Sequence, residues 1–284
     1  MRVTKTINNN VVCCVDDAGR EAIAMGRGLG FMLRAGAELD EAQAEKIFRM
    51  ETSEEQRRLS ELFSRLAPQQ IELCSKIVDY ASEELGRRLC ASIYLTLTDH
   101  LCFALERLRN GEVFQNPLLA EVRTFYPREY AVGKFALALL QRTLGAVFPD
   151  DEAASIAMHI VNAEYETSIS NTLRITQTLH DIVKTLKGWP GLGFSDESIF
   201  YDEFTVHLKF LVFRAFSGKC QTQEEAVFVR AVRRCYPLEF HCVEQITQGL
   251  SKRSGTQLPD AELAHLAAAL HRTCVRPMQG EKKG

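Results

Sequence analysis

The chain lacks any long apolar segment. Its 284 residues are 46% hydrophobic, yet no uninterrupted apolar run approaches the ~18 residues that a membrane-spanning helix needs. The N-terminal residues MRVTKTINNN also lack the apolar core of a signal peptide. We therefore expect a cytoplasmic protein without membrane insertion, with enough apolar content to build true hydrophobic cores.

The chain also lacks a large excess of charge of either sign. The net charge of -3 argues against a protein that coats nucleic acid through bulk charge. A small, local nucleic-acid-binding site is still compatible with this charge. Its nine cysteines are scattered and include no CxxC pair, which argues against a disulfide framework or a zinc scaffold. No HExxH sequence and no nucleophile elbow occurs. We expect no bound metal, no cofactor and no enzyme activity.

The first 50 residues have the periodicity of β-strands. Four alternating or β-branched runs, VTKTI, VVCCV, EAIAM and KIFRM, occupy residues 3–7, 11–15, 21–25 and 46–50. Asn8, Asn9 and Asn10 separate the first two runs, and asparagine tolerates the positive φ of a hairpin turn. Three glycines in GRGLGF (26–31) interrupt all periodicity. So short a module cannot easily bury a core alone, so we expect it to dimerise.

The remainder of the chain has helical periodicity. A capping box, Thr52-x-x-Glu55, begins a helical linker that ends at Pro68. Beyond it, apolar positions recur at intervals of three and four residues. The candidate helices are 69–85, 91–109, 128–144, 150–164, 170–187, 198–216, 238–253 and 260–274.

These helices form an internal repeat. Residues 94–111 align with 201–218, and residues 122–154 align with 232–264. Identities include Tyr94/Tyr201, His100/His207, Arg107/Arg214, Tyr126/Tyr236, Gly145/Gly255 and Glu152/Glu262. The period of about 110 residues is that of a small domain rather than of a solenoid unit. The sequence thus predicts a small antiparallel β-sheet module followed by two all-α helical bundles, with segments 1–56, 57–67 (linker), 68–169 and 170–284.

Two histidines occupy the same repeat position. His100 and His207 each lie in the middle of a helix, seven residues before an arginine. One such histidine is usually packing or surface filler, but a match between diverged copies favours a function. With no cluster of metal ligands and no nucleophile nearby in the sequence, the remaining chemistry is that of a phosphoryl acceptor, because neutral imidazole is nucleophilic near pH 7. A phosphate would add charge that can repel or bridge an apposed surface.

The other histidines are not duplicated. His159 aligns with Ala269 in the second copy. His265 and His271 flank that position but are out of register with His159, and helical geometry turns them to other faces. We interpret both as surface residues. His180 and His241 have no histidine counterpart and carry no functional prediction.

The N-terminal module holds a possible RNA site. Asparagine amides can bind base edges, lysine and arginine bind phosphates, and phenylalanine can stack on an unpaired base. The residues of these types are Lys5, Asn9, Asn10, Arg27 and Phe31, and residues 1–36 hold five basic and three acidic side chains. On these residues alone, a simple turn at NNN and a plain loop at GRGLGF explain the pattern equally well.

These motifs together resemble a known family. VTKTINNNVV followed by MGRGLGF resembles the co-antiterminator RNA-binding domain of the BglG/LicT-type transcriptional antiterminators. LTDH, AMHIVNAE and TVHLKF resemble, in order, motifs of their two phosphotransferase-system regulation domains. The resemblance implies a homodimer that binds a leader RNA hairpin of a sugar-utilisation operon and prevents the terminator from forming. The RNA contacts that it implies are Lys5, Asn8, Asn9, Asn10, Gly26, Arg27 and Phe31.

The resemblance also implies how such a protein is controlled. A sugar-specific enzyme II would inhibit through phosphorylation of His100 and His159 in the first regulation domain. The general phosphocarrier HPr would activate through His207 in the second. This chain departs from the family pattern at Ala269, where a second histidine is usual, so control that needs both sites of that domain is absent here.

Two alternatives stay open. A DNA-binding transcription activator with the same regulation domains would need a helix-turn-helix ahead of the repeats, which the strand-rich N-terminus does not provide. A phosphotransfer enzyme or metal-binding helical protein would use His100 and His159 together, and it would not need the GRGLGF segment.

Overall fold

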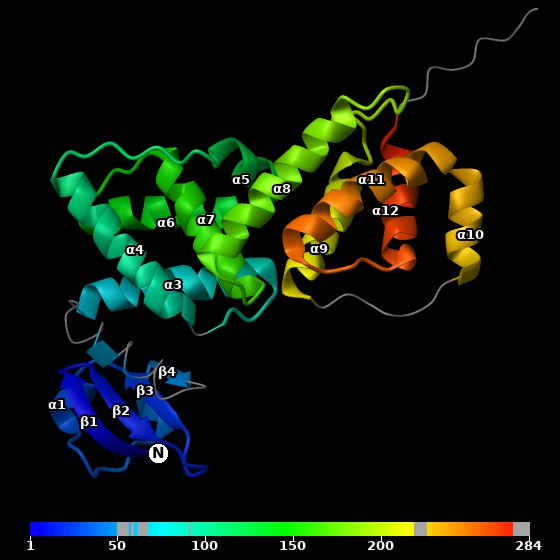
Figure 1. The fold of residues 1–284 in the computed structure, drawn as a ribbon. Helices are drawn as coiled ribbons and strands as arrows, with labels where there is room; N and C mark the ends of the chain where they lie inside the picture. Colours follow the sequence, from blue (N-terminus) through cyan, green and yellow to red (C-terminus); the bar gives the residue numbers. More distant parts are fainter. Residues whose placement is uncertain (50–56, 58–59, 62–67, 91, 219–225, 275–284) are drawn as a thin grey trace, which may run out of the picture. The chain divides into compact units, whose positions relative to one another are not determined.

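The structure, a computed structural model, describes residues 1–49, 57, 60–61, 68–90, 92–218 and 226–274 (Figure 1). It divides into two compact units, Met1–Glu166 and Thr167–Gly284. The first unit contains a β-sheet and a helical bundle, and the second contains helices (Figure 1). The predicted capping box at Thr52 and Glu55 lies outside the described residues.

The sheet is a four-stranded antiparallel meander. Its strands are β1 (Arg2–Asn8), β2 (Val11–Val15), β3 (Glu21–Met25) and β4 (Lys46–Arg49), hydrogen-bonded in that order. All four predicted strands are therefore confirmed. The pairing of Asn8 with Val11 closes the first hairpin and leaves Asn9 and Asn10 as its turn.

Apolar side chains line both faces of the sheet, which explains the continuous apolar run of β2. One face packs against Leu29 of the short helix α1 (Leu29–Met32). The residues of this face are Val12, Cys14, Ala22 and Ala24. The residues of the opposite face are Val11, Cys13, Ile23, Met25 and Phe48. Cys13 and Cys14 are buried free thiols and pack here as small apolar side chains.

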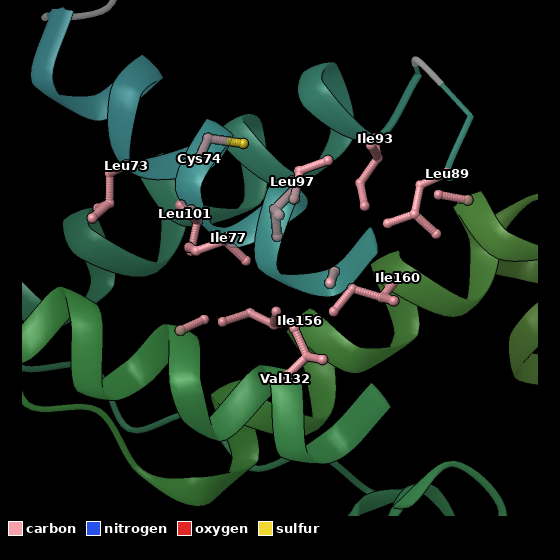
Figure 2. Packing of buried hydrophobic residues seen from close by; sticks show 14 of the residues in the cluster. Leu73, Cys74, Ile77, Leu89, Ile93, Leu97, Leu101, Val132, Ile156 and Ile160 are labelled. Atoms are coloured by element: carbon pink, nitrogen blue, oxygen red, sulfur yellow. The ribbon is translucent and has the colours of Figure 1, made fainter. Parts of the chain in front are cut away.

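Beyond residue 67, the described part of the first unit contains five helices. They are α3 (Pro68–Leu85), α4 (Ser92–Arg109), α5 (Leu119–Phe125), α6 (Pro127–Leu144) and α7 (Asp150–Glu164). Four were predicted to within a residue or two, and α5 was missed. Figure 2 shows their shared core, where α3, α4, α6 and α7 each contribute aliphatic side chains. Ile77, Leu97, Val132 and Ile156 from these four helices are all buried.

Helices α6 and α7 approach each other closely at Gly133. A Cβ atom at Gly133 would lie 2.2 Å from the backbone oxygen of Ala153, far inside contact distance. Glycine at 133 thus lets the two helices pack backbone to backbone. Because α7 carries His159, this packing also helps to set the position of the candidate site.

The second unit repeats the architecture. It contains α8 (Ile169–Lys187), α9 (Tyr201–Ser217), α10 (Ala226–Cys235), α11 (Pro237–Ser254) and α12 (Asp260–Thr273). The aligned Gly145 and Gly255 both end their helices in the left-handed conformation, at φ 68° and 76°. α10 was not predicted. In the described part of the chain, no helix is long and apolar enough to cross a membrane.

Candidate functional sites

The asparagine turn and the glycine-rich loop lie against each other. The backbone N–H of Gly26 donates to the Asn10 backbone oxygen (2.9 Å), and that of Gly30 donates to the Asn9 backbone oxygen (3.0 Å). The Gly28 N–H donates to the side-chain oxygen of Asn10 (2.8 Å). Segments 15 or more residues apart are thereby joined into one surface, so the sequence motifs at 8–10 and 26–31 form a single candidate site.

Two of the glycines are required by this geometry. A Cβ atom at Gly30 would lie 2.0 Å from the Asn8 backbone oxygen. Gly28 has φ +71°, a conformation that L side chains rarely adopt. The Asn8 side chain accepts a hydrogen bond from the Asn10 N–H (2.9 Å) and so stabilises the turn on which both loops depend.

The predicted RNA contacts fall into two groups. Asn8, Asn10 and Gly26 are wholly or partly buried and build the paired loops. Four side chains are instead exposed: Lys5, Asn9, Arg27 and Phe31. The ring of Phe31 is 80% exposed, and an exposed aromatic ring can stack on a nucleic-acid base.

Two further residues border this surface and were missed from the sequence. Glu45 accepts a hydrogen bond from the Arg27 backbone N–H (3.1 Å) and helps to hold the glycine-rich loop. Met32 is 67% exposed beside Phe31. The short helix that carries Phe31 and Met32 could have been suspected from the LGFM run, but three glycines concealed it.

A second candidate site lies between α4 and α7. The imidazole rings of His100 on α4 and His159 on α7 have centroids 4.8 Å apart and are tilted by 40°. His159 is buried, whereas the His100 side chain is 14% exposed. The structure thus brings together the two histidines predicted for the first regulation domain.

A buried carboxylate completes this site. Glu152 on α7 has one oxygen 3.1 Å from Nε2 of His100, and its other oxygen accepts a hydrogen bond from Arg107 on α4 (2.6 Å). Burial opposes ionisation of Glu152, but the imidazole and the guanidinium outweigh it and hold the pKa of Glu152 below its usual value. His100 and Arg107, like Glu152 and His159, are seven residues apart, so each pair shares a helix face.

His159 is neutral at physiological pH. Burial, and then the nearby charge of His100, lower the pKa of His159 to about 3. A neutral imidazole retains a nitrogen lone pair and can act as a nucleophile. Only 8% of the residue surface is exposed, so little of the ring is accessible while α4 and α7 are packed as they are here.

The second copy retains only part of this arrangement. Arg214 pairs with the buried Glu262, as Arg107 pairs with Glu152. His207, however, is exposed, and Ala269 is buried where the first copy has His159. The two copies therefore share a scaffold and an arginine–glutamate pair, but only the first encloses a pair of histidines.

His271 is not the surface residue that the sequence suggested. Its Nδ1 lies 2.9 Å from an oxygen of the buried Glu239, and its ring stacks on Tyr236 with centroids 3.9 Å apart. The buried carboxylate draws the imidazole inward, so His271 is half-buried. His265 is exposed, as expected, although its ring contacts Phe228.

Metal ligation finds no support in the described residues. No group of three or more histidine, cysteine, aspartate or glutamate side chains in the described ranges could hold a metal ion. His100 contacts a single carboxylate, that of Glu152, and this carboxylate is already paired with Arg107. The arrangement fits proton and phosphoryl chemistry at imidazole better than coordination.

Comparisons with known proteins identify the domains that carry these candidate sites. The CAT RNA binding domain family matches residues 1–57, and the PRD domain family matches residues 75–163 and 181–273. The transcription antiterminator LicT of Bacillus subtilis is 34% identical over 96% of this chain and 98% of its own length. The beta-glucoside operon antiterminator of Dickeya chrysanthemi is 36% identical over 96% of each chain.

A solved structure shares the fold of the first unit. The crystal structure of GlcT CAT-PRDI is 27% identical, has a TM-score of 0.53, and matches 57% of this chain and 97% of its own. The matched domains follow one another here in the same order as the sheet and the two bundles. The chain therefore belongs to the BglG/LicT-type family of transcription antiterminators, in which a CAT RNA-binding domain precedes two PRD domains.

Proposed function

We propose that the protein is an RNA-binding transcription antiterminator of a sugar-utilisation operon. It binds a hairpin in the leader of the nascent transcript, in the cytoplasm, and thereby prevents the overlapping terminator hairpin from forming. The observation that carries this proposal is the joining of the asparagine turn to the glycine-rich loop, which places Asn9, Arg27 and Phe31 on one exposed surface. The relatives are transcription regulators rather than enzymes.

The chemistry of that surface suits structured RNA. Arginine and lysine bind phosphates, the asparagine amide reads base edges, and the exposed aromatic ring stacks on an unpaired base. We expect two copies of the module to present these residues together in a homodimer, because a sheet of this size buries little core alone. The DNA-binding alternative is disfavoured, because residues 1–49 form a sheet rather than a helix-turn-helix.

Control is exerted through histidine phosphorylation by the sugar phosphotransferase system. A sugar-specific enzyme II phosphorylates His100 and His159 and inhibits the protein, and HPr phosphorylates His207 and activates it. The proposed mechanism is a two-state dimer: phosphate in the first regulation domain opens the protomer interface and separates the two RNA-binding surfaces. The buried, neutral His159 and the exposed His207 support different routes of access for the two donors.

A gel-shift experiment with the full chain tests the RNA-binding part. The probe is the leader hairpin upstream of the operon that adjoins this reading frame, and the control probe has the same composition with the loop bases exchanged. We expect specific binding to the leader hairpin, with a steep dependence on salt concentration. Equal affinity for both probes, or binding to duplex DNA instead, would contradict the proposal.

A further inference from the structure

The carboxylate of Glu152 serves two cationic groups at once. Its two oxygens contact Nε2 of His100 and the guanidinium of Arg107, and the side chain is almost entirely buried. A buried carboxylate is stabilised only by such partners, since water cannot reach it. Any group that removes one of the partners therefore leaves Glu152 charged and incompletely compensated inside the α4–α7 contact.

The second copy lacks this dependence. Glu262 pairs with Arg214 alone, and His207 is exposed rather than held against the carboxylate. New charge on the His207 ring would face solvent. New charge on the His100 ring would instead lie within a few ångström of the Glu152 carboxylate, in a site that excludes water. The same chemical modification therefore meets opposite electrostatic surroundings in the two copies.

Arg107 lies beside a cavity into which its guanidinium can move. This cavity has a volume of about 410 Å³, and Glu152 also lines it. Its guanidinium lies 4.7 Å from the centre of the Phe114 ring, which holds the charge at the cavity wall. The cavity gives a phosphate room beside Arg107, and arginine binds phosphate with two parallel hydrogen bonds.

We infer that Glu152 is the positioning residue that converts a phosphoryl group on His100 into a weakening of the α4–α7 contact. The inference rests on the proposed phosphorylation. The phosphate displaces the carboxylate from the imidazole and takes Arg107 as its own counter-ion. Glu152 then stays buried without either partner, and the helices separate to hydrate it. Glu262 cannot act in this way, because its contact with Arg214 does not involve the modified ring.

The modification itself needs no further reactant. The bond between phosphorus and the donor atom breaks, and its electron pair stays with the donor atom. An imidazole nitrogen of His100 forms the new bond to phosphorus, and the proton that this ring loses passes to the donor atom. In phosphoramidate, a small chemical donor, the donor atom is nitrogen, and ammonium is released.

The test uses the full chain treated with phosphoramidate, with occupancy at His100 measured by peptide mass spectrometry at neutral pH. Thermal unfolding is then recorded before and after treatment for the wild type, Glu152→Gln and the matched variant Glu262→Gln. Treated His100→Ala gives the background from all other histidines. Because the comparison is between treated and untreated samples of each variant, a merely structural effect of the substitution cancels.

We expect phosphorylation to lower the first unfolding transition of the wild type and of E262Q by roughly 4 °C, the shift that a modest loss of stability causes in a domain of this size. In E152Q the shift should fall to less than half. If E152Q alone unfolds too easily, the double variant R107Q/E152Q, which removes both charges, replaces it with the same expectation.

The outcomes separate this inference from the proposed function. Equal shifts in the wild type and E152Q, at equal occupancy of His100, would overturn the role of Glu152 and leave phosphorylation of His100 intact. No phosphoryl group on His100 in the wild type would contradict the proposed control itself, and the inference would fall with it. A shift that is lost in E262Q but kept in E152Q would also overturn the inference.

Discussion

Individual residues of the RNA-binding module divide into those that build the loops and those that face outward. Asn8, Asn10 and Gly30 make contacts within the paired loops, so substitutions there alter the shape of the surface. Phe31 makes almost none of these contacts through its ring, because that ring is exposed. The distinction separates loss of folding from loss of binding.

Replacement of Phe31 by alanine should therefore weaken RNA binding without lowering stability. Loss of one base-stacking ring costs about 1–3 kcal/mol of binding free energy, which is a loss of affinity of about fivefold to 150-fold. Fluorescence anisotropy with the leader hairpin measures the affinity, and circular dichroism checks the melting temperature. Phe103→Ala is the matched control, because Phe103 is also exposed but lies on α4. Equal effects of the two substitutions would argue against stacking on Phe31.

Burial of the neutral His159 should make the first regulation domain sensitive to acid. The folded-state pKa of His159 is about 3, below its ordinary value of 6.5. Between these values the unfolded chain binds a proton that the folded chain excludes, so stability falls as the pH is lowered through this window. The slope approaches about 1.4 kcal/mol per pH unit.

Urea unfolding at pH 7, 6 and 5 measures this slope. His159→Gln should flatten the pH dependence of the first transition, whereas His241→Ala should not, because the His241 side chain is 60% exposed. An unchanged slope in H159Q would contradict a buried neutral imidazole.

Residue-level contacts were the least predictable feature. The duplication identified His100 and His207, and it also contained Arg107 with Arg214 and Glu152 with Glu262. The ion pairs were missed because a sequence overlay gives positions within a fold and does not say which helices touch. His271 was misjudged for a related reason, since its position depends on Glu239, more than 30 residues away.

At the scale of elements, helices α6 and α7 depend on one small residue. Gly133→Ala would place a methyl group against the Ala153 backbone oxygen, and backbone cannot yield as a flexible side chain can. We expect a loss of about 1–3 kcal/mol in the stability of the first regulation domain. Because α7 carries Glu152 and His159, the candidate site should be disturbed as well.

Gly249→Ala is the matched control for this prediction. Gly249 lies within α11, is exposed, and a Cβ atom there would meet nothing within 4 Å. Alanine favours helix over glycine by about 1 kcal/mol, so this variant should be slightly more stable. Chemical denaturation of both variants gives the comparison, and destabilisation of G249A as large as that of G133A would contradict the close α6–α7 contact.

Long periodic elements were predicted well and short ones were not. The ends of α7 agree with the sequence pattern, and the strands agree because their turns contain asparagine and glycine. The short helices α1 and α5 were missed, since a helix of one or two turns has too few residues to display a period. α10 was missed although it is longer. Tertiary contacts hold such helices, so little of their stability is encoded locally.

At the scale of the whole molecule, the two regulation domains are related by sequence and unequal in chemistry. The first encloses the His100–His159 pair and a carboxylate that contacts His100 and Arg107, and the second has the exposed His207 and Ala269 at the aligned positions. The duplication was evident from the sequence, and so was the loss of the second histidine. The exposure of His207 was not evident from the sequence, because helical periodicity shows which residues share a helix face but not which other elements pack against that face.

This inequality predicts opposite phenotypes for the two duplicated histidines. His207→Ala should lower antitermination under activating conditions, because the activating phosphate has no acceptor. His100→Ala should instead reduce the dependence of antitermination on the sugar. A leader–reporter fusion, measured with and without the sugar, gives both values. The scheme of phosphoryl control would be wrong if neither variant changed the response.

An antiterminator binds leader RNA and thereby lets transcription continue. This activity can be measured by single-round transcription in vitro across the operon leader, with purified full-length protein added. We expect the fraction of full-length transcript to rise with protein concentration, and a leader with a disrupted antiterminator hairpin to show no rise. Termination that is unaffected by the wild-type protein on the intact leader would mean that the protein is not an antiterminator of this operon.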